Sequence, residues 1–115
     1  MEHVNAKVSL SNPGSGYFDE VIVEDIADRN CFSYTDNENF LCEICVYEDG
    51  LCLFRQGEDH LLELHLKSGH YAKITTAEGI FKIEVKVLEF QLNSDILVIR
   101  YLIEDEERII SINYC

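Results

Sequence analysis

The chain has 115 residues, of which 47% are hydrophobic, and its 22 acidic and nine basic side chains give a formal net charge of −13. These totals predict one folded domain over residues 1–115 and exclude a disordered chain. They also argue against nucleic-acid binding, because phosphate-binding surfaces need clustered lysine and arginine side chains. We expect the acidic excess mainly to keep a small protein soluble.

The first residues lack the apolar core of a signal peptide, and no segment approaches the length that spans a bilayer. We therefore expect a cytoplasmic protein without membrane association. Residues 1–16 are predicted to form a partly flexible N-terminal region. It comprises a strand at 4–10 and a loop at 11–16, which contains the only proline.

Alternation of apolar and polar residues, which is typical of a strand with one buried face, recurs along the rest of the chain. Val21 and Val23 are the expected core residues of a strand at 17–26, and Phe32 and Tyr34 are those of the next strand, at 31–35. No amphipathic helix of ordinary length is visible. The predicted strands cover residues 17–26, 31–35, 40–48, 51–56, 62–66, 71–76, 80–90, 96–104 and 107–114.

Four turns between these strands predict hairpins and their register. Asp49-Gly50 is a strong hairpin signal, and similar two-residue loops are expected at Glu78-Gly79 and Asp105-Glu106. A three-residue loop at 68–70 keeps the neighbouring strands on a single core face. The predicted pairs are Val46–Leu53, Ile44–Arg55, Leu66–Ala72, Leu64–Ile74, Thr76–Phe81, Ile74–Ile83, Ile103–Arg108, Tyr101–Ile110, Ile99–Ile112 and Leu97–Tyr114.

Two local features interrupt this regularity. The apolar residues are odd-numbered from Phe81 to Val87 and even-numbered at Leu88 and Phe90, which predicts a β-bulge near Val87. The four consecutive acids at 104–107 could suggest a calcium loop, but the spacing and glycine of such a loop are absent, so we expect a solvated turn. Together, the strands and nearest-neighbour hairpins favour an all-β, antiparallel up-and-down barrel of about eight to ten strands.

The five cysteines are an odd number, which argues against a disulfide framework in a cytoplasmic protein. Cys42 and Cys45 resemble half of a zinc site. However, positions i and i+3 of a strand point to opposite faces, so the two sulfurs cannot converge on one metal. We expect the cysteines to act as small buried hydrophobic residues, and we predict neither a metal site nor a cofactor.

An ordered set of short motifs resembles the bacterial YwiB-like family, whose function is unknown. The set comprises LFRQG at 53–57, Leu62 and Leu64, a glycine turn at Gly69, TAEG at 76–79, and the alternating strand to Phe90. The resemblance covers roughly residues 17–114. It implies a calycin-like β-barrel, of the same broad architecture as lipocalins and fatty-acid-binding proteins, and it implies no chemistry. The matching family positions are Arg55, Gly57, Tyr71, Thr76, Gly79 and Tyr101.

The first candidate function is binding of a small apolar or amphipathic ligand inside the barrel. The candidate ligand-binding residues are Arg55, Tyr34 and Tyr101, because an arginine among aromatic rings suits a carboxylate or phosphate head group. Alternatively, Arg55 closes one end of the barrel and is satisfied by carbonyl groups or an acidic side chain.

The second candidate function is a protein-interaction module or a homodimer that acts through an exposed strand or the acidic surface. An enzyme is the least favoured function, and no catalytic residue is predicted. His65 and Tyr71 fall on the expected outer face of the sheet beside charged residues. The sequence alone brings no cysteine and histidine together, and it contains no nucleophile elbow.

Overall fold

The computed structural model describes residues 3–67 and 69–114, and these form ten antiparallel strands without a helix. Consequently, this part of the chain contains no helix that could cross a membrane. The strands are β1 (Val4–Asn12), β2 (Tyr17–Ile26), β3 (Cys31–Thr35), β4 (Leu41–Tyr47), β5 (Gly50–Gln56), β6 (His60–His65), β7 (Tyr71–Thr76), β8 (Gly79–Leu92), β9 (Ile96–Ile103) and β10 (Glu106–Tyr114).

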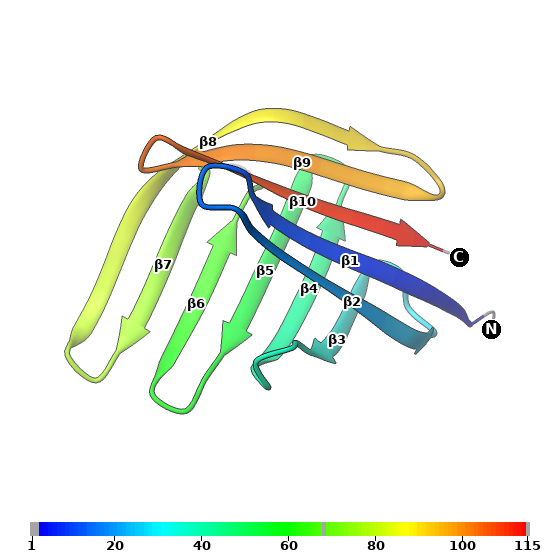
Figure 1. Cartoon of the computed structure of the whole chain (residues 1–115), viewed down its shortest axis with the longest axis horizontal. Coiled ribbons are helices and arrows are strands. Elements are labelled where there is room, and N and C mark those ends of the chain that lie inside the picture. Colours follow the sequence, from blue (N-terminus) through cyan, green and yellow to red (C-terminus); the bar gives the residue numbers. More distant parts are fainter. Residues whose placement is uncertain (1–2, 68, 115) are drawn as a thin grey trace.

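The strands form a nearly closed up-and-down barrel, which confirms the predicted all-β fold class. Their order is β2-β1-β10-β9-β8-β7-β6-β5-β4-β3, so each strand pairs with a neighbour in sequence except where β1 joins β10. Figure 1 shows β1, β2, β9 and β10 crossing over the layer formed by β3 to β7. Within the described residues, β2 and β3 form the two ends of the order, and no strand pairing joins them.

Strand β8 connects the two layers because each half pairs with a different neighbour. Residues 79–84 pair with β7, whereas residues 85–92 pair with β9. The register with β9 shifts between Val87 and Glu89, which leaves Leu88 unpaired. This shift confirms the predicted bulge, and bulges bend the strand that contains them. Leu88 is exposed, while Phe90 packs against the core.

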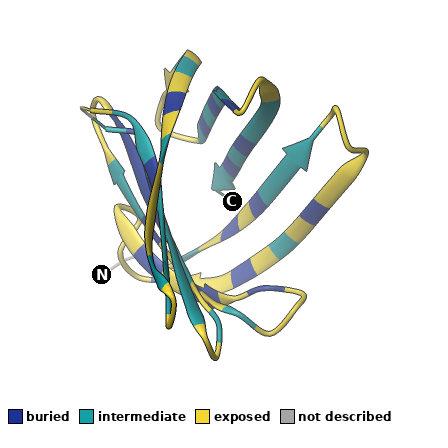
Figure 2. Ribbon diagram, turned by 90° about the vertical axis from the view of Figure 1, so that its left-hand side faces the viewer, coloured by how far each residue is buried: buried dark blue, intermediate teal, exposed yellow. Residues whose placement is uncertain are grey.

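One continuous hydrophobic core fills the space between the layers. Buried residues alternate with less buried ones along several strands, such as β3 and β9 (Figure 2), as the period of two in the sequence predicts. Leu97, Ile99, Tyr101 and Ile103 are the inward residues of β9, and all four are buried. Val23 is also buried, and Val21 packs against the core from the same face of β2.

The predicted hairpin registers are wrong by two residues wherever a turn was used to set them. For example, Ile44 pairs with Leu53 rather than with Arg55, and Ile74 pairs with Phe81 rather than with Ile83. A shift of two keeps every side chain on its predicted face, so alternation alone cannot detect the error. The observed pairs also include Val46–Leu51, Leu64–Ala72, Leu62–Ile74, Thr76–Gly79, Tyr101–Arg108, Ile99–Ile110 and Leu97–Ile112.

The turns explain this shift. The last hairpin turns at Glu104-Asp105, one residue before the predicted position, and both residues have positive φ angles of 52° and 65°. This conformation is typical of a type I′ turn, whose twist suits a hairpin.

At the N-terminus, β1 extends to Asn12, so the predicted loop at 11–16 is shorter than expected. Ser68, in the predicted loop at 68–70, lies outside the described residues, as do Met1, Glu2 and Cys115.

The cysteines depart in part from the prediction that they are small buried hydrophobic residues. Cys42 and Cys52 are buried and free, as expected. Cys31 and Cys45 are instead joined by a disulfide between directly opposed positions of β3 and β4. The prediction is wrong for this pair because only the pairing of the two strands brings the sulfurs together. Cys42 and Cys45 do lie on opposite faces of β4.

We expect Gly50→Ala to destabilise the fold strongly. Gly50 has a φ of 156°, and a Cβ atom there would overlap the backbone oxygen of Leu66. The backbone of Leu66 is held in place because its N–H donates to Leu51 O at 2.9 Å. Gly79 is a matched control, because its φ of 145° is similar but no atom lies near its missing Cβ. Urea denaturation should show that Gly50→Ala costs about 1–3 kcal/mol more than Gly79→Ala. Equal losses would show that the contact with Leu66 is unimportant.

Candidate ligand-binding cavity

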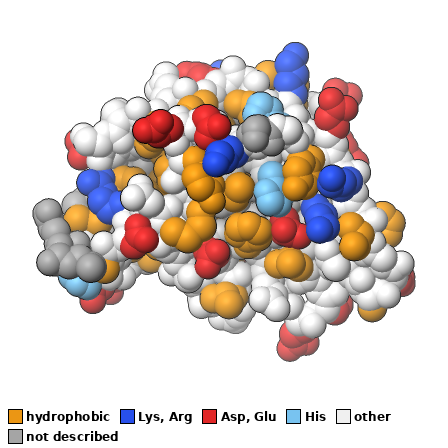
Figure 3. All heavy atoms as spheres, turned by 180° about the vertical axis from the view of Figure 1, so that it is seen from behind, with side chains coloured by type: hydrophobic (Ala, Val, Ile, Leu, Met, Phe, Trp, Pro, Cys, Tyr) orange, Lys and Arg blue, Asp and Glu red, His pale blue; other side chains and the backbone are white. Residues whose placement is uncertain are grey.

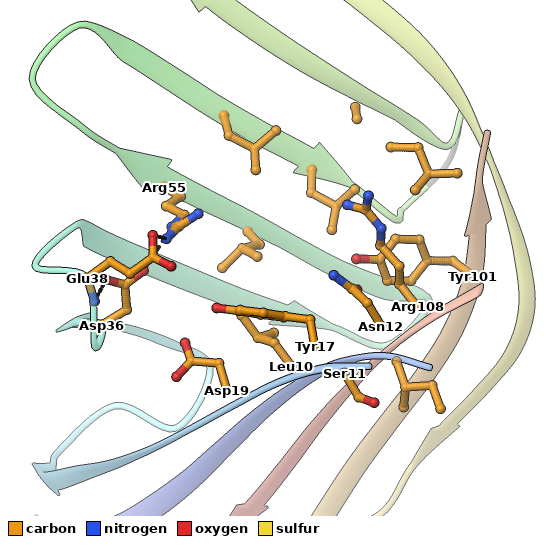
Figure 4. Close-up of a pocket in the computed structure, with 16 residues that line it drawn as sticks. Leu10, Ser11, Asn12, Tyr17, Asp19, Asp36, Glu38, Arg55, Tyr101 and Arg108 are labelled. Atoms are coloured by element: carbon orange, nitrogen blue, oxygen red, sulfur yellow. Dashed lines mark hydrogen bonds and ion pairs between the residues drawn. The ribbon is translucent and has the colours of Figure 1, made fainter. Parts of the chain in front are cut away.

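A cavity of about 300 Å³ opens at one end of the barrel, between the two layers. Figure 4 shows the side chains that line it, which come from both layers and point into the same space. The lining residues are Leu10, Ser11, Asn12, Tyr17, Asp19, Asp36, Glu38, Leu53, Arg55, Leu62, Leu64, Ala72, Tyr101, Ile103, Arg108 and Ile109.

Strand pairing places these side chains in order. On one layer, Asn12 lies opposite Tyr17, and Tyr101 lies opposite Arg108. The four residues come from adjacent strands β2, β1, β10 and β9, so they form a polar row at the end of the cavity. On the facing layer, Leu53, Leu64 and Ala72 are cross-strand neighbours and provide an apolar wall. The cavity therefore has a polar row on one layer and an apolar wall on the other, and that second layer also contributes Arg55 and the acids of the β3–β4 turn.

Arg55 lines the cavity, and its guanidinium is already paired. Nε donates to Asp36 Oδ2 at 2.8 Å, and Nη2 donates to Glu38 Oε2 at 2.9 Å. The guanidinium also lies 4.3 Å from the centre of the Phe40 ring, a cation–π distance. The arginine on an apolar face thus finds its partners in the turn between β3 and β4, which it ties to β5.

Asp36 is the buried partner in this pair, with 2% of its side chain exposed. Besides the bond from Arg55, its Oδ1 accepts the N–H groups of Glu38 and Phe40, each at 2.9 Å. Burial by itself would raise the pKa of Asp36. The hydrogen bonds from Phe40, Arg55 and Glu38 outweigh burial and hold the pKa below its ordinary value. Sequence analysis did not single out Asp36.

Asp19 is a second buried acid that sequence reasoning missed. It is 8% exposed and lies opposite Leu10 on the inner face of β2. Its carboxylate accepts a hydrogen bond from the Asn37 side chain, which also donates to Glu20 O at 3.3 Å. These contacts cross from the β3–β4 turn to β2. Asp19 has the same parity as Val21 and Val23, and that was the signal for its inward position.

Tyr101 and Arg108 form the opposite end of the polar row. Tyr101 is 6% exposed, and burial raises its pKa to about 12. The side chain of Arg108 is 35% exposed, and its Nη2 lies 3.6 Å from Glu106 Oε2. Its Nε is buried and has no acceptor within residues 3–67 and 69–114. Sequence analysis proposed Tyr101 as a ligand-binding residue but did not single out Arg108.

Tyr34, the third ligand-binding candidate from the sequence, lies in the core beside this cavity and is not one of its lining residues. It pairs with Cys42 across β3 and β4, and its hydroxyl is buried without a hydrogen-bond partner in the described part of the chain. Burial raises the pKa of Tyr34. Burial and then the negative charge of Asp36 raise the pKa of Cys42 to about 11.

The outer face of the layer formed by β3 to β7 contains a cysteine and a histidine that sequence reasoning did not bring together. Cys52 Sγ lies 3.6 Å from His65 Nδ1, and His65 Nε2 lies 3.4 Å from Glu63 Oε1. Seen from behind, hydrophobic, histidine and basic side chains gather on one face of the molecule (Figure 3). Burial raises the pKa of Cys52, which favours the unreactive thiol over the thiolate. We assign this group no catalytic role.

A possible group of metal ligands also lies on this outer face. The ligand atoms of Cys31, Glu43 and Cys45 lie within 4.8 Å of one another. Because Cys31 and Cys45 are joined by a disulfide, they offer no thiolate to a metal. The group therefore does not form a metal site in this state.

We expect Asp36→Asn to lower the free energy of unfolding by about 1–3 kcal/mol at neutral pH, because it removes the charged partner of Arg55. A lowered folded-state pKa stabilises the fold above the unfolded pKa of about 3.9, and this contribution is lost as the pH falls further. In urea titrations, the difference between wild type and Asp36→Asn should therefore shrink below about pH 4.

Glu38→Gln is the control for this experiment, since 54% of the Glu38 side chain is exposed. We expect it to change stability by no more than about 1 kcal/mol. A difference between wild type and Asp36→Asn that stays constant down to about pH 3 would contradict the assignment of the charge to Asp36.

Comparison with known proteins gives one structural likeness to describe. The chain is similar to the ywiB protein from Bacillus subtilis, with 15% sequence identity, coverage of 96% of this chain and 87% of that protein, and a TM-score of 0.45. A scan against protein-family models found no match, and a search of curated proteins found none. We draw no functional argument from a likeness at this level.

Proposed function

We propose that the barrel binds one small amphipathic molecule in the cavity between its layers. The cavity itself is the observation that supports this function. Its volume of about 300 Å³ is at the lower end of the range of about 300–1,000 Å³ that is usual for small-molecule sites. Calycin-like barrels such as lipocalins use their interiors in this way, and we propose that this chain is related to them through the YwiB-like family.

The chemistry of the lining favours an amphipathic ligand over a purely apolar one. Leu53, Leu64 and Ala72 form the apolar wall, and each is at least nine-tenths buried. Polar side chains converge from the other layer, which is the pattern of a site that orients its ligand. A molecule with a short apolar body and one polar group would satisfy both sides.

Octanol is a suitable neutral probe for this function, and two-dimensional amide NMR can follow its titration. We expect saturable shifts at the lining residues of β5, β6 and β9. Ala72→Leu should weaken binding at least tenfold, because its added bulk occupies the cavity. Thr75→Leu places the same leucine side chain on the outer face of β7 and should bind octanol like the wild type. The proposal fails if octanol causes no saturable shifts, or if Ala72→Leu binds it as tightly as the wild type.

The open edge at β2 supports association through an exposed strand as the second candidate function. No strand of the described chain pairs with the outer edge of β2. Phe18 and Ile22, on its outward face, are 61% and 63% exposed. Unpaired edges with apolar side chains are sites where a further strand can add.

Light scattering after size-exclusion chromatography tests this second function. If the β2 edge mediates self-association, the mass should rise with protein concentration, and Ile22→Lys should return it to that of the monomer. The matched variant Ile80→Lys changes another residue that is 63% exposed, far from this edge in the strand order, and should have no effect. A monomeric mass at every concentration would contradict self-association through β2.

A further inference from the structure

The hydrogen bonding of the arginines distinguishes Arg108 from the others. Arg55 and Arg100 each donate to two carboxylates, and Arg29 donates to Ser94 O and lies 4.3 Å from the centre of the Tyr114 ring. Within the described residues, Arg108 makes no hydrogen bond, and its contact with Glu106 is 3.6 Å long. It is therefore a partly buried guanidinium whose donors remain available.

Arg108 lies where a ligand in the cavity could meet it. Its partner across the strands is the buried Tyr101, so the side chain is on the inner face of β10. Figure 4 shows the Arg108 side chain projecting into the cavity beside Tyr101 and Asn12. A buried donor without an acceptor is unfavourable, and a ligand that supplies an acceptor at this guanidinium would remove that penalty.

The neighbours of Arg108 also supply hydrogen-bond donors. The Asn12 amide and the Tyr101 hydroxyl can each donate, and both residues line the cavity. Together with the guanidinium, they form a row across three adjacent strands, β1, β10 and β9, that suits an anionic oxygen group. The planar fork of arginine matches a carboxylate in two parallel hydrogen bonds.

The acidic residues of the cavity are either paired with Arg55 or lie on a strand two places from Arg108. Asp36 and Glu38 are both paired with Arg55. Asp19 lies on β2, two strands away from Arg108 on β10, and two strand spacings correspond to about 10 Å. Glu106 is the acid that lies near Arg108, and its side chain is 57% exposed to solvent. The excess of donors is thus at the Arg108 end.

We propose that Arg108 binds the carboxylate of the ligand, and that the ligand class is a small amphipathic carboxylate whose apolar part contacts Leu53, Leu64 and Ala72. This inference rests on the proposed function and specifies the charge and orientation of the ligand. In this arrangement Arg55 stabilises the β3–β4 turn, and Arg108 is the residue that selects the anion.

Three probes with the same number of carbon atoms test the inference: octanoate, octanol and octylamine, each titrated at neutral pH and followed by amide NMR. We expect octanoate to bind about 10–100-fold more tightly than octanol, as a charged hydrogen bond would give. Arg108→Gln should weaken octanoate binding by about the same 10–100-fold and so abolish this preference, and the dispersion of its amide spectrum shows that the variant folds. Arg108→Lys should retain part of the preference, because it keeps the charge but loses the fork.

Arg100→Gln is the matched control, because Arg100 pairs with Glu89 and Glu107 away from the cavity and its side chain is 40% exposed. It should leave the preference for octanoate intact. The inference is overturned if octanol binds as well as octanoate, if octylamine binds most tightly, or if Arg108→Gln keeps the preference. Octanol binding in those cases would leave the proposed function standing, whereas failure of all three probes overturns both.

Discussion

Strand β8 must pair with β7 along one half and with β9 along the other, and the arrangement of the whole barrel depends on this constraint. A straight strand would extend one flat sheet, and the inner faces of the two layers would not meet. The unpaired Leu88 allows the strand to bend between its two partners. The facing layers then enclose both the hydrophobic core and the cavity at its end.

The cavity contains two arginines with different surroundings, and this difference connects stability with the proposed binding. Arg55 faces two carboxylates of the β3–β4 turn, and one of them, Asp36, is almost completely buried. Removing either member of such a pair leaves the other buried without a partner, so the Arg55–Asp36 pair stabilises the fold. Arg108 has no comparable partner in the described chain, so its donors remain available to a ligand.

Features that depend on local alternation could be predicted from the sequence, whereas contacts made by strand pairing could not. The strands over 17–26 and 31–35 match β2 and β3, and the bulge near Val87 follows from the change of parity at Leu88. The inward position of Arg55 was predicted correctly, although its partner across the strands was not. Cys31 and Cys45, and likewise Cys52 and His65, come together only through strand pairing.

The sequence by itself determined which face of each strand is buried, since alternation of apolar residues reports the face directly. It could not determine the hairpin registers, because a shift by two residues preserves every face and the choice depends on turn conformations such as that at Glu104. Only the tertiary structure decided which acids reach Arg55 and which arginine of the described chain makes no hydrogen bond. Those contacts join residues from different strands and turns, and no local pattern records the distances between them.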